Sequence, residues 1–347
     1  MVRSLFASLI LALSISVLPA MAEEGPTVVA LAHAAVQDAA ADPAAAMASE
    51  FRHQLDSLSG GSLKGAIYPD GQLGGNRDMA KLVAEGVVQT GLISVGGVAP
   101  LYPPIAVTAM PFALDNPEAA YALYDGPFGQ ALSADIERKT DLVVLGYGDS
   151  GGMHILTNSK LPVHSPADMA GLKIRSIPGY EALDVMIRAM GATPVNVSSR
   201  EELPSLEAHT IDGQMSSAIA VLSRHYDLVQ GYATMTGHLY APYVWIYNRA
   251  AFAKLSPEQQ AVVREAARRA ILAGRSLSAR LEASNRGTAG LAKRMDVVIL
   301  TPAERAAFKV IAQPKVAEVL DKALGEEGIR LRADFMAAAA QANASHR

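Results

Sequence analysis

The sequence predicts an α/β protein that is built as two lobes and has mostly parallel strands. At 347 residues, half of them apolar and only 18% charged, the chain is long enough to bury a large core and to form two lobes rather than one. Aromatic residues make up 5% and alanine is abundant, a composition that suits helices packed on sheets better than an all-β barrel. Strand-type and helix-type segments also alternate, which is the order typical of parallel sheets covered by helices.

The first residues predict export. A short positive start at residues 1–3 precedes an apolar stretch at residues 5–18 and a small-x-small motif at residues 20–22. This pattern is typical of a secretory signal peptide over residues 1–22, which is cleaved to leave the mature chain in the periplasm. A membrane anchor is the alternative. It is less favoured because serines and Pro19 interrupt an apolar run that is shorter than the ~20 residues needed to span a bilayer.

The mature chain continues with alternating strands and helices. Strand-type segments occupy residues 27–34, 61–69, 90–97, 142–148, 153–159, 172–178 and 193–198. Helix-type segments lie between them, after the first strand as far as residue 58 and at residues 76–86, 116–139 and 180–191. This alternation is the basis for the predicted parallel sheets.

Two capping boxes mark helix starts in the last third of the chain. Ser256-Pro257-Glu258-Gln259 combines a capping serine, a proline at the first helical position and a reciprocating glutamine. Helical periodicity then continues through residues 257–295, and a helix of that length is expected to span both lobes. Thr301-Pro302-Ala303-Glu304 is the second box, and the alanine-rich tail at residues 333–347 is expected to fray.

Composition excludes several classes of function. The chain contains no cysteine, so disulfides, thiol nucleophiles and zinc-cysteine sites are ruled out. The formal net charge is −4 and no basic cluster occurs, which makes nucleic acid an unfavoured partner. No His-x-x-x-His or comparable spacing appears either, and we expect no metal or other cofactor.

A glycine-rich segment, GYGDSGG at residues 146–152, matches two enzyme motifs. Gly148 to Gly152 spell the nucleophile loop of trypsin-like proteases, but the upstream candidates His33 and Asp38 lie only five residues apart in a helical setting. Gly146, Gly148 and Gly151 fit a dinucleotide fingerprint, but strand-type residues follow where a helix is needed. The segment therefore favours a flexible passage between lobes, and we expect no enzyme.

Five blocks together show a family resemblance. They are YPDGQLGGNRDM at residues 68–79, and the segments at residues 109–129, 157–178, 211–214 and 255–267. With these blocks, in this order, the chain resembles the solute-binding proteins of TRAP transporters, the DctP-like family, over nearly the whole mature sequence. That family delivers organic acids to a sodium-driven membrane permease.

The resemblance implies a clamp like that of periplasmic binding proteins, with a hinge and a long helix that spans both lobes. Lobe I is expected at residues 23–149 plus about 238–272, and lobe II at residues 150–237 plus about 273–347. The implied partners are a small carboxylate-bearing solute and the small and large membrane subunits of the permease, with the protein itself a monomer. A periplasmic protein that senses a ligand for a membrane receptor is the alternative.

Arg175 is the principal candidate for ligand binding. A guanidinium presents a planar pair of donors that match a carboxylate, and it stays charged at any working pH. Arg175 lies at the end of an expected strand and is followed by Pro178, which stiffens the exit. By position alone a surface ion pair is the favoured interpretation. The resemblance reverses this, because the arginine of this motif is the family's carboxylate anchor.

Two departures from the family pattern bear on the ligand. His154 stands where many relatives have a second arginine, and Met215-Ser216-Ser217 stands where relatives commonly have Glu-Asn-Pro. His154 can donate one hydrogen bond to a carboxylate, although a neutral histidine satisfied by the backbone is an equal alternative. With one retained arginine, the sequence favours a monocarboxylate, or an acid whose second group is uncharged, over a dicarboxylate.

The remaining candidates follow from their places in the family pattern. Tyr240 is the better cleft candidate among the aromatic residues near the second passage between lobes, whereas Trp245 is expected in the core. For Arg77, a structural role and a ligand-binding role are equally favoured. The other predicted ligand contacts are His33, Ser94, Val95, Gln214 and Ser216.

Overall fold

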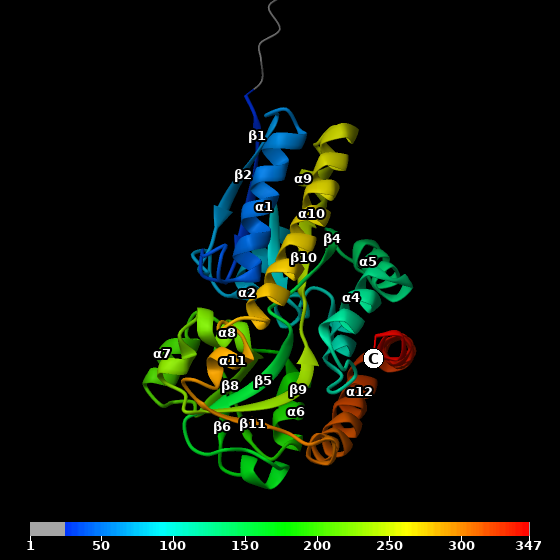
Figure 1. Ribbon diagram of the computed structural model, residues 1–347. Coiled ribbons are helices and arrows are strands. Elements are labelled where there is room, and N and C mark those ends of the chain that lie inside the picture. The colour runs from blue at the N-terminus through cyan, green and yellow to red at the C-terminus, as the bar shows by residue number, and fades with distance from the viewer. Residues whose placement is uncertain (1–24, 347) are drawn as a thin grey trace, which may run out of the picture.

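The structure is a computed structural model that describes residues 25–346, so the predicted signal peptide lies outside the described residues. Its strands form two separate sheets, one above the other in Figure 1. We call the five-stranded sheet with its helices lobe I and the six-stranded sheet with its helices lobe II. The predicted two-lobed α/β class is confirmed.

Lobe I has the strand order β2-β1-β3-β10-β4. Its strands are β1 (Thr27–His33), β2 (Leu63–Tyr68), β3 (Thr90–Ser94), β4 (Leu142–Gly148) and β10 (Tyr243–Asn248). β1 pairs in parallel with β2 and β3, whereas β10 runs antiparallel to β3 and β4.

Lobe II has the strand order β11-β9-β5-β8-β6-β7. Its strands are β5 (Met153–Asn158), β6 (Lys173–Ser176), β7 (Thr193–Asn196), β8 (Gly213–Ser217), β9 (Tyr232–Tyr240) and β11 (Asp296–Ile299). β5 runs antiparallel to β8 and β9, and the other pairs are parallel.

The strands that run antiparallel to their neighbours, β5 and β10, are the two that follow directly after the chain crosses from one lobe to the other. The chain passes from β4 to β5 between Gly148 and Met153, and returns from β9 to β10 between Tyr240 and Tyr243. A parallel neighbour needs a long crossover connection, whereas β5 and β10 arrive directly from the other sheet. The sequence predicts mostly parallel strands, and β5 and β10 are the antiparallel exceptions. The residue ranges predicted for the lobes stay a prediction.

Two long helices cover one face of the lobe I sheet. α1 (Pro43–Leu58) and α10 (Pro257–Glu282) lie side by side in Figure 1 and share an apolar core with Trp245. Trp245 is fully buried, as predicted, with its ring centroid 4.9 Å from that of Phe51. Its indole Nε1 donates to Thr90 Oγ1 at 3.0 Å, so the polar end of the ring is satisfied.

The helix α10 begins as predicted and ends earlier. The side chains of Ser256 and Gln259 form the expected capping box. The helix stops at Glu282 rather than near residue 295, because turns intervene before the short helix α11 (Thr288–Leu291). Leu277 and Leu281, near its end, pack with Ile219 of α8 (Ala218–Ser223) in lobe II. A helix that spans both lobes is therefore confirmed.

The other helical elements surround the sheets. In the first half of the chain they are α2 (Asn76–Ala84), α3 (Val95–Val98), η1 (Pro103–Ala109), α4 (Pro117–Asp125) and α5 (Pro127–Lys139). In the second half they are η2 (Pro166–Met169), α6 (Glu181–Ala189), α7 (Glu202–Glu207), η3 (Tyr226–Leu228) and α9 (Arg249–Ala253).

The last helix, α12 (Pro302–Ser345), is interrupted at Gly325, whose φ is 63°. Its first part packs against α6 and η1, and its second part lies against α4 and α5, as Figure 1 shows. Phe335 packs on Phe128 of α5 with ring centroids 5.4 Å apart, and Asn343 Nδ2 donates to the Ala113 carbonyl at 2.9 Å. The expected fraying of the tail is wrong as far as residue 346, because buried side chains and hydrogen bonds to residues 113–116 hold this segment.

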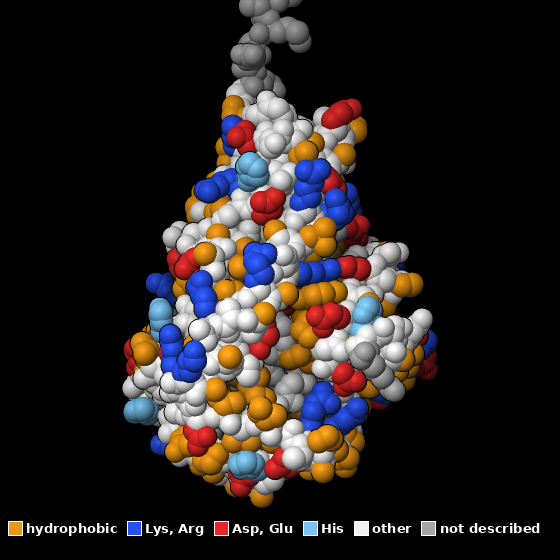
Figure 2. Space-filling view, in the orientation of Figure 1, with side chains coloured by type: hydrophobic (Ala, Val, Ile, Leu, Met, Phe, Trp, Pro, Cys, Tyr) orange, Lys and Arg blue, Asp and Glu red, His pale blue; other side chains and the backbone are white. Residues whose placement is uncertain are grey.

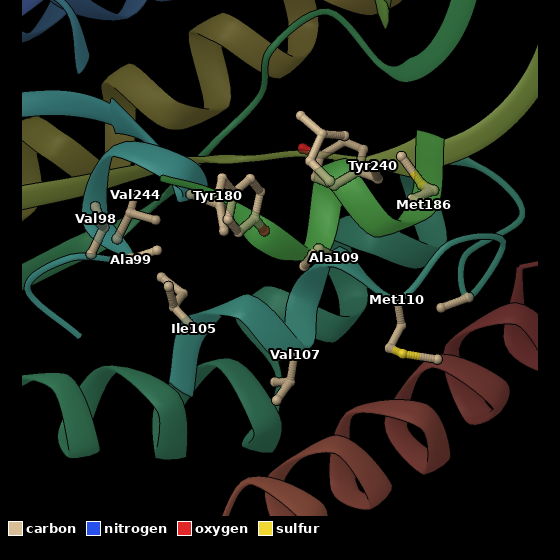
Figure 3. Packing of buried hydrophobic residues seen from close by; sticks show 14 of the residues in the cluster. Val98, Ala99, Ile105, Val107, Ala109, Met110, Tyr180, Met186, Tyr240 and Val244 are labelled. Atoms are coloured by element: carbon tan, nitrogen blue, oxygen red, sulfur yellow. The ribbon is translucent and has the colours of Figure 1, made fainter. Parts of the chain in front are cut away.

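An apolar cluster continues from one lobe into the other. Ile105, Val107 and Ala109 of η1 belong to it, together with Tyr180 before α6 and Tyr240 at the end of β9. Figure 3 shows Tyr180 and Tyr240 extending toward the η1 segment that carries Ala109. The lobes therefore meet through close packing as well as through the two passages of the chain.

The glycine-rich segment at residues 146–152 is one of those two passages. Asp149 is buried and accepts hydrogen bonds from the Tyr121 hydroxyl (2.8 Å) and from the amides of Gly151 (3.2 Å) and Gly152 (3.0 Å). The Ser150 hydroxyl donates to the Ala241 carbonyl at 2.7 Å, which ties this passage to the returning one. Ser150 thus has a structural contact in place of the histidine partner that a nucleophile requires.

Candidate functional site

A cavity of about 340 Å³ lies between the lobes and is lined by both of them and by both passages. It sits at the carboxyl ends of β3, β6 and β8, which is where open α/β sheets place their ligands. On the face shown in Figure 2, Lys and Arg side chains lie among Asp and Glu side chains rather than in one patch.

The lobe I wall is formed by the start of α2 and the end of β3. Ser94 and Val95 line the cavity, and the Ser94 amide donates to Asn76 Oδ1 at 2.9 Å. Asn76 Nδ2 also donates to Ser199 Oγ in lobe II at 3.4 Å, so Asn76 connects the two walls. Arg77 lies at the rim, where its side chain is exposed. The structure thus brings Ser94, Val95 and Arg77 to one site.

Arg175 is held on the lobe II wall, at the end of β6. Its Nε donates to the Val197 carbonyl at 3.0 Å, and its Nη1 lies 3.8 Å from Glu202 Oε2, beyond hydrogen-bond distance. The side chain is only 12% exposed and lines the cavity. The Nε contact fixes the guanidinium, and its two terminal nitrogens make no hydrogen bond within residues 25–346. They can therefore donate a bidentate pair to a carboxylate.

A second guanidinium, that of Arg224, lines the same cavity at the end of α8. Its Nη2 donates to the Tyr243 hydroxyl of lobe I at 3.4 Å. Burial lowers the pKa of Arg224, but its neighbours Tyr226, Tyr243, Asp42 and Glu202 raise the pKa well above its ordinary value. Arg224 is therefore a permanently charged group inside the cavity. The cavity thus holds a second guanidinium beside that of Arg175, on an element other than the one that carries His154.

Two histidines lie together on the lobe II wall. His154 on β5 and His238 on β9 line the cavity with their ring centroids 6.3 Å apart. Burial, with the charges of Arg224 and Arg175, lowers the pKa of His154 to about 4. Burial, with the neighbouring His154 and Arg305, lowers the pKa of His238 to about 3. Both imidazoles are neutral at pH 7, so His154 can offer a ligand a neutral hydrogen bond but no charge.

The other predicted contacts divide into two groups. Ser216 and Tyr240 line the cavity, as predicted for ligand contacts. His33 and Gln214 do not belong to its lining. The His33 ring shares a hydrogen bond with the exposed Gln37, at 3.0 Å from its Oε1. Gln214 Nε2 donates to Thr157 Oγ1 at 2.8 Å in a buried contact, so both side chains are engaged elsewhere.

Several lining residues were not predicted from the sequence. They include Tyr180, Glu202, Arg224, His238 and Tyr243. Arg224 follows α8 at a turn where His225 adopts a left-handed φ of 60°, and no local motif marks it as a ligand contact. Arg224 and Tyr243 are separated in sequence and come from different lobes, so only the fold shows that they are in contact.

Metal clusters and membrane-spanning helices are both absent from the part of the chain that the structure describes. Among residues 25–346, no group of three or more His, Cys, Asp or Glu side chains is arranged to hold a metal ion. No helix in the same range combines the length and the apolar character that crossing a membrane requires.

The buried histidines predict a pH dependence of stability. Burial lowers the pKa of His33 to about 4, as it does for His154, and that of His238 to about 3, whereas an unfolded histidine titrates near 6.5. Between these values the unfolded chain binds more protons than the folded chain, so stability is complete above pH 6.5 and falls as the pH drops toward 4. We expect a smaller free energy of unfolding at pH 5 than at pH 7, measured with urea.

His154→Asn provides the test of that cause. Removing this imidazole should reduce the pH dependence of the unfolding free energy by up to about 1.4 kcal/mol per pH unit between pH 4.5 and 6. The matched control is His53→Asn, because His53 is exposed. An unchanged pH dependence in His154→Asn would show that this imidazole does not titrate as stated.

Most of the chain matches a known family of proteins. Residues 33–323 match the family model DctP, described as bacterial extracellular solute-binding protein, family 7. The 2,3-diketo-L-gulonate-binding periplasmic protein of Escherichia coli K12 is 34% identical over 221 residues, which are 63% of this chain and 66% of the relative. The match thus spans slightly less than two thirds of that relative's length.

Solved structures match over more of the chain. A TRAP periplasmic solute-binding protein from Polaromonas with bound D-erythronate has a TM-score of 0.81 and 27% identity, covering 90% of this chain and 98% of its own. A TRAP periplasmic solute-binding protein from Shewanella oneidensis with bound succinate has a TM-score of 0.82 and 25% identity, covering 92% and 100%. Both are two-lobed proteins of the same overall fold as this one.

Proposed function

This chain belongs to the DctP family of bacterial extracellular solute-binding proteins, and from that premise we propose that it captures a small organic acid between its two lobes and delivers it to a membrane permease. The observation that carries the proposal is Arg175. A fixed guanidinium in a cavity shared by both lobes, with its two terminal nitrogens available, suits a single carboxylate.

Binding is coupled to closure of the lobes. Ligand contacts from both walls stabilise the closed form, since a ligand shifts an equilibrium toward the state that it contacts best. Lobe I offers Ser94 and Val95, and lobe II offers Arg175, His154 and Ser216. The two passages near Ser150 and Ala241 are where the backbone would rotate.

The ligand class is a carboxylate, as in the relatives. The proteins with bound D-erythronate and succinate, and the 2,3-diketo-L-gulonate-binding protein, are consistent with an acid as the solute here. The partner would be a sodium-driven TRAP permease with small and large membrane subunits, and the compartment the periplasm. No catalytic step is part of this proposal.

A thermal-shift screen tests the function directly. The mature chain, from residue 23, is expected to unfold at a higher temperature when a small organic acid is bound. At an acid concentration of one hundred times the dissociation constant, binding adds about 2.7 kcal/mol to the free energy of unfolding. Uncharged sugars and the amides of the same acids should leave the midpoint unchanged, because they cannot pair with Arg175. If no acid raises the midpoint, or if neutral sugars raise it equally, the proposed function is wrong.

A further inference from the structure

Arg224 is a charged side chain without an ionic partner in the site. Within residues 25–346 no carboxylate oxygen lies within the 4 Å of an ion pair from its guanidinium. Its Nη2 has the 3.4 Å contact with Tyr243, and its Nε is buried with no hydrogen-bond partner in the described chain. A buried donor left unpaired costs about 1–3 kcal/mol, so this geometry favours a ligand that supplies an acceptor.

Arg224 and Arg175 belong to one electrostatic environment. Both line the cavity on the lobe II side, and both lower the pKa of His154. The charge of Glu202, which lies 3.8 Å from Arg175, also raises the pKa of Arg224. Both guanidiniums therefore face one cavity of about 340 Å³, and a single small acid held in it lies beside both of them.

The balance of charge limits what that ligand can be. The inner wall carries the two guanidiniums and the buried carboxylate of Glu202, an excess of one positive charge. Arg77 and Asp78 offset each other at the exposed rim. Asp42, whose charge influences Arg224, lies outside the cavity lining, and burial raises its pKa and so favours its neutral form. A single carboxylate neutralises the excess. A second carboxylate would leave a buried negative charge, which is costly.

Neutral polar groups complete the wall. Ser94 Oγ, Ser216 Oγ and His238 Nε2 are buried and have no hydrogen-bond partner in residues 25–346. A hydroxyl both donates and accepts, so ligand hydroxyls can satisfy such groups where a plain alkyl chain cannot. Unpaired polar groups in a site reject analogues that lack the matching hydroxyl.

We propose that Arg224 is a specificity-determining residue that binds an uncharged oxygen of the ligand while Arg175 holds its carboxylate. The ligand class is then a hydroxylated monocarboxylic acid rather than a dicarboxylate or a plain fatty acid. This inference rests on the proposed function and deepens it.

The test compares matched acids on matched variants by titration calorimetry. The probes are D-erythronate and butyrate, which share four carbons, galactonate and hexanoate, which share six, and succinate as the dianion. We expect the wild-type chain to bind at least one hydroxylated acid about tenfold or more tightly than its unsubstituted partner and than succinate. Arg224→Gln should weaken the binding of that hydroxylated acid by about 10- to 100-fold, and should change the affinity for the unsubstituted acid by less than about twofold.

Two further variants keep the test decisive. Arg200→Gln removes an exposed arginine near the cavity rim, outside its lining, and should leave every affinity unchanged. Arg224→Lys keeps the charge but loses the planar donors, so it should lose most of the preference for hydroxylated acids and serves if Arg224→Gln does not fold.

The outcomes separate this inference from the proposed function. If Arg224→Gln weakens the binding of a hydroxylated acid and of its unsubstituted partner equally, Arg224 acts on the carboxylate or on the fold. That result would overturn the inference. Unchanged affinity for the hydroxylated acid, or tighter binding of succinate, would also overturn it while leaving capture of an acid intact. Failure of every acid to bind would contradict the proposed function and this inference together.

Discussion

Arg175→Ala is expected to weaken binding of the acid ligand by about 2–5 kcal/mol, because it leaves a desolvated carboxylate without its charged partner. The guanidinium lies 12% exposed in the cavity, so little solvent is present to replace the lost hydrogen bonds. Titration calorimetry with the acid that gives the largest thermal shift measures the change. Arg175→Lys should recover only part of the affinity, since an ammonium cannot form the planar bidentate pair.

The control for this variant is Arg188→Ala. Arg188 lies on α6 of the same lobe, with its side chain 59% exposed beside Asp184, and it takes no part in the cavity wall. We expect its removal to change affinity by less than about 0.5 kcal/mol. Affinity that is unchanged in Arg175→Ala would remove the residue on which the proposed function depends.

Gly151→Ala is expected to cost about 2 kcal/mol or more of unfolding free energy. Gly151 has a φ of 99°, which residues with a Cβ rarely adopt, and strain of this kind costs about 1–3 kcal/mol. A Cβ there would also overlap Ser217 Oγ and lie 3.2 Å from Ile219 Cβ, and such overpacking adds about 1–3 kcal/mol. Because Gly151 lies in the passage between the lobes, the affinity for ligand should fall as well.

Gly231→Ala is the matched control for this variant. Gly231 is exposed, has no left-handed φ, and a Cβ added there meets nothing within 4 Å. Its replacement should change the free energy of unfolding by less than about 1 kcal/mol. Urea unfolding that finds the two variants equally stable would show that the backbone at Gly151 is not constrained as described.

The sequence predicted the parts of the fold that depend on local chemistry. The capping boxes at Ser256 and Thr301 both form, and Trp245 is in the core. Periodicity alone could not locate the end of α10 at Glu282, since residues 283–295 remain compatible with a helix until tertiary turns break it. The antiparallel direction of β5 and β10 could not be predicted from the sequence either, because it depends on how the chain passes between the sheets.

The site was predictable where a motif marks a residue and hidden where only the fold joins distant residues. Arg175 and Ser94 line the cavity as expected. His33 also lies at the end of a strand, but its ring forms a hydrogen bond with Gln37 that no sequence pattern indicates. Arg224 meets Tyr243 from the opposite lobe, so the expectation of a single cationic residue was incomplete. The prediction of a ligand with a single carboxylate therefore depends on the charge of Glu202, which offsets one of the two guanidiniums, and no longer on the presence of a single arginine.

A crystal structure of the mature chain with the acid that gives the largest thermal shift would show whether the carboxylate is bound between the lobes by Arg175. We expect the acid in the cavity between the lobes, with its carboxylate oxygens about 2.7–2.9 Å from the terminal nitrogens of Arg175. It also predicts contacts to Ser94 or Val95 on the lobe I wall. An acid bound outside this cavity, or one whose carboxylate points away from Arg175, would contradict it.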